Sequence, residues 1–227
     1  MTESNPAPAP AQSSTTARLE AFSDGVIAIA ITLLVLEIAI PAANRTDSLI
    51  DALGRQWPSY VAFLISFVVI GIMWVSHHSM FQRIASVDRG MLFLNLMLLM
   101  GIAFLPFPTA LLAEYVRAGG ENSHVAAAIY SAVMALIGLA FVAMWRHLLR
   151  NPDLLVAGIS REQVENAIKK SMVGPIVYTL SIGLAFISAL ACLVVYALVA
   201  LYFGRNPSSR VATPRARLDA GDVSQDS

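Results

Sequence analysis

The chain alternates long apolar runs with short polar connections, the pattern of a protein that crosses a membrane several times. Four such runs are followed by a stretch with no charged residue, residues 172–203. One helix of that length would extend about 48 Å at about 1.5 Å per residue, well beyond the roughly 30 Å hydrocarbon core. We therefore predict two spans there, joined by a turn near Ser188. The six predicted spans are residues 20–40, 57–78, 91–112, 125–147, 172–187 and 188–203.

Polar tails flank these spans. Residues 1–16 are mainly Pro, Ala, Ser and Thr, and residues 204–227 are polar and charged. Both tails are predicted to be disordered, on either side of one transmembrane domain, residues 17–203. No basic segment precedes the first apolar run, which favours an uncleaved anchor over a signal peptide.

Local signals refine two of the connections. Pro106 and Pro108 each remove a helix hydrogen bond, so they are expected to bend or end the third span. Ser160 and Gln163 have the spacing of a capping box, which favours a short surface helix before the fifth span.

Composition supports an all-α membrane protein embedded in the lipid bilayer. Apolar residues make up 57% of the chain and charged residues only 13%, against about 25% charged in soluble domains. The formal net charge is zero, and neither nucleic acid nor another protein is predicted as a partner. The single cysteine, Cys192, excludes an intrachain disulfide and a cysteine-rich metal site.

The distribution of Lys and Arg predicts the orientation. With a cytoplasmic N-terminus, 12 of the 15 basic residues fall on the cytoplasmic side. This positive-inside pattern favours both termini in the cytoplasm and an even number of spans in the plasma membrane. It does not distinguish six spans from four, because the last predicted hairpin carries no charge.

The first span, "RLEAFSDGVIAIAITLLVLEIAIP", has two faces at about 100° per residue. Thr32 lies at the edge of one face, and Ser23 and Asp24 point to the other side. Taken alone, an apolar stripe of this kind is typical of packing or lipid contact. The stripe consists of Arg18, Phe22, Gly25, Ile29, Leu33 and Leu36.

Asp24 is expected to need partners, because an unpaired carboxylate inside a membrane span is costly. The candidate partners are predicted to lie at the same depth, and we favour a structural polar network over a catalytic one. These candidates are Arg18, His77, His78 and Asn95.

Three segments together resemble the transmembrane protein 175 family of endosomal and lysosomal potassium channels. "RLEAFSDG" matches the Arg-x-x-x-Phe-Ser-Asp signature, followed by "WVSHHSMFQRI" and "NLMLLMGIAFLPFPTALLAEY". The resemblance covers about residues 18–203 and implies a homotetramer of six-helix subunits. The first helix of each subunit would then line a central potassium-permeable pore without a P-loop selectivity filter.

The resemblance also implies a constriction of bulky apolar layers on the first helix. These layers fall on Ile29, Leu33 and Leu36, with Thr32 as the nearby hydroxyl. Potassium selectivity is expected to be modest, and no cofactor is predicted; potassium is only the permeating ion. Glu37 either concentrates cations at the outer mouth or is an ordinary interfacial acid. Animal members carry two six-span units, whereas this chain has one FSD motif, so four chains would be needed.

Two other functions compete with this reading. A proton- or cation-coupled secondary transporter would use intramembrane Asp, His and Asn as relays, but would more often show inverted repeats. A metalloenzyme is disfavoured because His77 and His78 are adjacent, and adjacent helical residues do not share a face. We therefore predict neither a metal site nor an enzyme.

Overall fold

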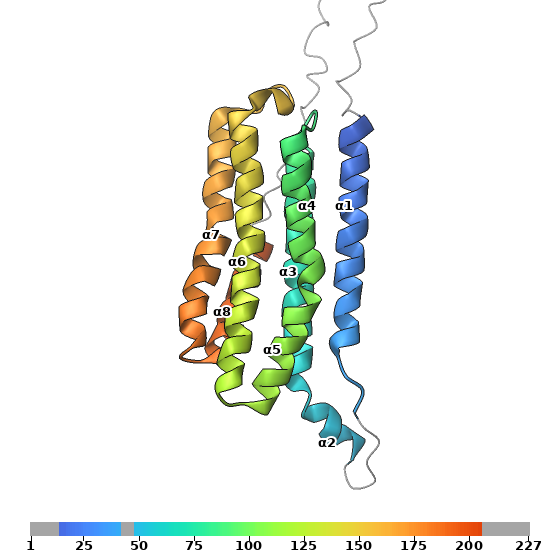
Figure 1. Cartoon of the computed structure of the whole chain (residues 1–227), viewed down its shortest axis with the longest axis vertical. Coiled ribbons are helices and arrows are strands. Elements are labelled where there is room, and N and C mark those ends of the chain that lie inside the picture. Colours follow the sequence, from blue (N-terminus) through green and yellow to red (C-terminus); the bar gives the residue numbers. More distant parts are fainter. Residues whose placement is uncertain (1–13, 42–47, 206–227) are drawn as a thin grey trace, which may run out of the picture.

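Helices account for most of residues 14–41 and 48–205, the ranges that the computed structural model describes (Figure 1). The predicted disordered tails lie outside these ranges except at their inner ends, where residues 14–16 and 204–205 are helical. The elements are α1 Ser14–Leu33, η1 Leu34–Glu37, α2 Leu49–Gly54, α3 Trp57–Phe81, α4 Arg89–Phe104, α5 Pro106–Ala118, α6 Glu121–Arg150, η2 Pro152–Leu154, α7 Arg161–Ala185 and α8 Ala189–Arg205.

Four segments in the described ranges are long and apolar enough to cross a membrane by length and composition. They are Thr15–Glu37, Trp57–Phe81, Arg89–Ala118 and Glu121–Arg150. α8 is apolar but has only 17 residues, or about 26 Å. The chain is therefore an all-helical membrane protein in its described part, with four full-length spans and two further long helices, α7 and α8.

The first and fifth predicted spans differ from the observed helices. α1 begins at Ser14, six residues before the predicted start. With the 3₁₀ helix η1 that follows it, the first span ends at Glu37 rather than at residue 40. The predicted surface helix and the fifth span are one continuous helix, α7, from Arg161 to Ala185. The capping box at its start is present, since the Ser160 and Gln163 side chains each accept from the other's backbone N–H. No breaker stops the helix before the apolar segment, so it runs on.

The third predicted span is divided at its prolines. α4 ends at Phe104 and α5 begins at Pro106, whose ring removes the hydrogen bond that would continue α4. At the start of α5 the Leu105 carbonyl accepts from both the Thr109 N–H at 3.2 Å and the Thr109 hydroxyl at 2.9 Å. The prolines thus change the direction of this span without ending it (Figure 1).

Successive membrane-crossing segments run in opposite directions, so the described connections between them gather at two ends of the bundle (Figure 1). The start of α1, the α3–α4 connection and the α6–α7 connection lie at one end, and the α5–α6 and α7–α8 connections at the other. α1 forms one side of the bundle and α7 the opposite side, with α3 to α6 between them. α8 packs against both α7 and α3. This arrangement leaves α1 covered on one face only.

Candidate functional site

The first helix has one buried and one exposed apolar face. Ile27, Ala30 and Leu34 are at most 2% exposed and face the bundle, where α1 contacts α3 and α4, and η1 contacts α3 and α5. On the other face Ile29 is 61% exposed and Leu33 is 40% exposed. A helix that needed only to pack one face would not require Ile and Leu on both, so the outer face must contact lipid or other protein.

Leu36 lies beyond the end of the α-helix, in the 3₁₀ turn η1, and is 73% exposed. Residues three apart eclipse one another in a 3₁₀ helix. Leu36 therefore stays on the same side as Leu33, and the stripe continues through the change of helix type. Glu37 is the last residue of this turn.

Thr32 is exposed on this face, and its hydroxyl donates to the Ile29 carbonyl at 2.8 Å. The hydroxyl proton is therefore occupied by the helix backbone. The oxygen lone pairs remain available to accept a hydrogen bond or to contact a cation.

A fully buried polar network joins the middle of α1 to α4 and α3. Asn95 Nδ2 donates to Ser23 Oγ at 2.9 Å, and Asn95 Oδ1 lies 2.9 Å from His77 Nε2. Ser23 donates its own proton to the Leu19 carbonyl at 2.8 Å. Because Ser23 must then accept from Asn95, the amide oxygen faces His77, and His77 carries its proton on Nε2. All three network side chains are 0% exposed.

Asp24 is not part of this polar network, although the sequence predicted Asn95 and His77 among its partners. Its carboxylate accepts instead from the indole N–H of Trp74 at 2.9 Å. One helical turn away, His78 Nδ1 lies 2.8 Å from the Glu20 carboxylate. α1 and α3 are antiparallel, so moving four residues forward on α1 means moving four back on α3. This register pairs Asp24 with Trp74 and Glu20 with His78.

The two pairs form a ladder, since the Trp74 and His78 rings stack with their centroids 6.0 Å apart. Trp74 and Glu20 were missed by the sequence reasoning. The one available signal was their spacing, four residues from His78 and from Asp24 respectively.

The remaining motif residues stay outside both groups. The Arg18 side chain is exposed and makes no hydrogen bond or ion pair with residues in the described ranges. Phe22 is 54% exposed on the same side as Ile29. His77 and His78 face different partners, and the described residues include no cluster of three or more His, Cys, Asp or Glu that could hold a metal ion.

Comparison with known proteins gives the chain its family. The family model "Endosomal/lysosomal potassium channel TMEM175" matches residues 18–106. A potassium channel of Streptomyces collinus is 49% identical over 201 residues, which cover 87% of this chain and 97% of that protein. A potassium channel of Chamaesiphon minutus is 43% identical over 197 residues, covering 86% and 96% of the two chains.

A solved structure agrees with these sequence relatives. The crystal structure of a lysosomal potassium-selective channel TMEM175 homolog from Chamaesiphon minutus superposes with a TM-score of 0.78 at 40% identity. It covers 86% of this chain and all of that one. The chain therefore belongs to the TMEM175 family of potassium channels.

Proposed function

We propose that the protein is a potassium-permeable channel in which the outer face of α1 lines a central pore between subunits. The observation that carries the proposal is the exposed stripe of Ile29, Leu33 and Leu36 on a helix whose other face is already packed. Four copies around one axis would cover this stripe, giving a homotetramer. The relatives are named as potassium channels, which favours a channel over a coupled transporter and over an enzyme.

An apolar ring of this kind closes a pore by excluding water. Where Ile29 side chains from several subunits meet, no continuous water column passes, and an ion would lose its hydration shell without replacement. Conduction then requires the helices to turn or separate. Such a movement would have to change the contacts of α1 with α3 and α4, which include the bonds of Asp24 to Trp74 and of Ser23 to Asn95.

Selectivity would come from partial replacement of the hydration shell near Thr32. Its oxygen faces outward with its proton held by the Ile29 carbonyl, and so presents lone pairs to a cation. Sodium loses more on dehydration than potassium does, and the part of α1 described here supplies no carbonyl cage. We therefore propose a modest preference for potassium.

The proposed membrane arrangement has six spans, with α7 and α8 completing the four full-length ones. The connections that carry most Arg and Lys lie at the end of the bundle where α1 begins (Figure 1). We place the protein in the plasma membrane, where by the positive-inside rule this end of the bundle faces the cytoplasm. Glu37, at the opposite end of α1, would then lie at the outer mouth.

A pair of matched substitutions tests the pore assignment. Ile29→Ser and Ile176→Ser make the same chemical change at residues that are 61% and 51% exposed, on α1 and on α7 at the opposite side of the bundle. Ile29→Ser should raise the resting current of reconstituted channels and reduce their discrimination between potassium and sodium, because a polar ring stays wet. Ile176→Ser should leave both unchanged. Equal effects of the two variants would show that Ile29 faces lipid.

A further inference from the structure

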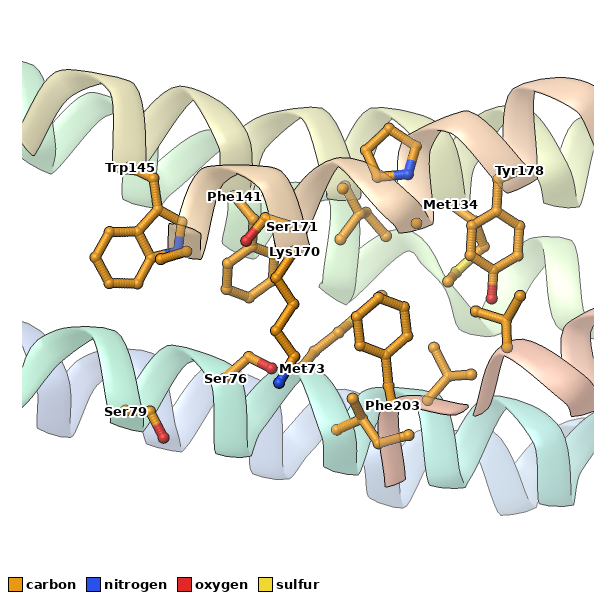
Figure 2. Close-up of a pocket in the computed structure, with 18 of the residues that line it drawn as sticks. Met73, Ser76, Ser79, Met134, Phe141, Trp145, Lys170, Ser171, Tyr178 and Phe203 are labelled. Atoms are coloured by element: carbon orange, nitrogen blue, oxygen red, sulfur yellow. The ribbon is translucent and has the colours of Figure 1, made fainter. Parts of the chain in front are cut away.

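A cavity of about 290 Å³ lies between α3, α6, α7 and α8 (Figure 2). It is on the side of the bundle away from α1, so it is separate from the proposed pore (Figure 1). The volume is near the lower end of ligand-binding pockets, which run from about 300 to 1,000 Å³.

The inner part of this cavity is apolar. Met73, Met134, Phe141 and Phe203 line it, and Tyr178 lies at one end in Figure 2. Part of the space exists because α7 carries Gly174, where an added Cβ would meet nothing within 4 Å. A flexible hydrocarbon chain matches such a lining better than a polar metabolite does.

The other end of the cavity is cationic. Lys170 extends into it in Figure 2, and Arg83 also lines it, while the described residues of the lining include neither Asp nor Glu. The Arg83 backbone is held in place, because its carbonyl accepts from the Val156 N–H at 3.0 Å and the Ala85 N–H, two residues on, donates to the Leu154 carbonyl at 2.8 Å. Its guanidinium lies 5.6 Å from the centre of the Trp145 ring.

This end of the cavity coincides with the ends of the membrane-spanning helices. Arg83 follows the last residue of α3 by two positions, and Trp145 lies in the last turns of α6. A tryptophan beside basic residues at such a level is typical of the interface between hydrocarbon and headgroups. Partial burial lowers the pKa of Arg83, because desolvation disfavours its charge, and an adjacent anion would offset that loss.

We propose that the cavity binds an anionic phospholipid, with its phosphate between Arg83 and Lys170 and one acyl chain along the apolar lining. Basic pockets between transmembrane helices hold lipid headgroups in this way. The ligand is a lipid of the leaflet at the basic end of the bundle. The site does not depend on α1 forming the pore.

Native mass spectrometry of the purified oligomer with added phosphatidylglycerol tests the headgroup contact. Lys170→Gln should weaken binding about fivefold, the equivalent of about 1 kcal/mol for one basic residue near a lipid phosphate. Lys169→Gln is the matched control, since Lys169 is exposed and outside the cavity lining, and should bind as the wild type does. Lys170→Arg, which keeps the charge, should restore binding. The same spectra report whether each variant assembles.

A second pair tests the acyl chain. Gly174→Leu fills the cavity, whereas Gly183→Leu places the same side chain on the same helix with equally open surroundings outside the cavity. Only Gly174→Leu should lose the bound lipid. The proposal would be overturned if the two members of either pair bound the lipid equally, or if phosphatidylcholine bound as well as phosphatidylglycerol. It would also be overturned if glycerol phosphate displaced the lipid at equal concentration. The last result would identify a site for a free anion.

Discussion

Replacing Asn95 by Leu is expected to be among the most destabilising single changes in the bundle. Asn95 is 0% exposed and joins three helices through its hydrogen bonds to Ser23 and His77. Leu has a similar volume, so the substitution removes the polar contacts while leaving the space filled. Its effect therefore isolates the network from packing.

The magnitude follows from the contacts that are lost. Two interhelical hydrogen bonds in a membrane protein are worth about 0.6 kcal/mol each on average. The His77 Nε2–H is then left without an acceptor in a fully buried site, which costs about 1–3 kcal/mol more. Asn95→Leu should therefore lower the free energy of unfolding by about 2–4 kcal/mol.

The assay is loss of helical circular dichroism during sodium dodecyl sulfate titration in mixed micelles. Asn122→Leu, the same change at an exposed position on α6, is the control and should stay within about 0.5 kcal/mol of the wild type. The double variant His77→Phe/Asn95→Leu should be more stable than Asn95→Leu, because it removes the orphaned donor as well. An Asn95→Leu protein as stable as Asn122→Leu, or a double variant less stable than the single one, would refute the reasoning.

Three other changes test separate parts of the structure. Asp24→Ala leaves the Trp74 indole without its acceptor, so it should lower the yield of assembled oligomer in size-exclusion chromatography more than it alters current ratios. Full assembly with altered selectivity would contradict this. Gly138→Ala should cost about 1–3 kcal/mol in the same titration, because its Cβ would lie 2.7 Å from the Pro175 ring, whereas Gly71→Ala, with open space, should not destabilise. Asp88 caps α4 by accepting from the Met91 N–H, and that bond lowers the pKa of Asp88, so Asp88→Ala should cost about 1 kcal/mol at pH 7. The folded-state pKa lies below the unfolded value of about 3.9, so the difference in free energy of unfolding between the wild type and Asp88→Ala should be greatest above that pH. It should vanish as the pH falls through the lowered pKa, and a pH-independent difference would argue against the cap.

The apolar runs were long enough to locate the main helices from sequence, and the prolines located the break between α4 and α5. The fusion of the predicted surface helix with the fifth span was not foreseen. The charged first turns of α7 favoured a separate surface helix. Pro175 is accommodated inside α7 because Gly138 on α6 leaves room for its ring. That compensation lies on another helix and has no local signal.

For the polar residues around the middle of α1, too, the sequence predicted one property and not another. Their common depth followed from the alternating direction of the spans, and this placed Ser23, Asn95 and His77 near one another. Which donor meets which acceptor depends on the register between antiparallel helices. One residue of slippage would change every partner, so the pairing of Asp24 with Trp74 required the structure.

The central claim, a potassium-preferring channel, is tested most directly by the reversal potential of the purified protein in planar bilayers. The measurement uses potassium on one side and sodium on the other. A potassium-preferring channel gives a current whose reversal potential is shifted toward the potassium equilibrium potential. A reversal potential at zero, with equal passage of the two ions, would contradict it.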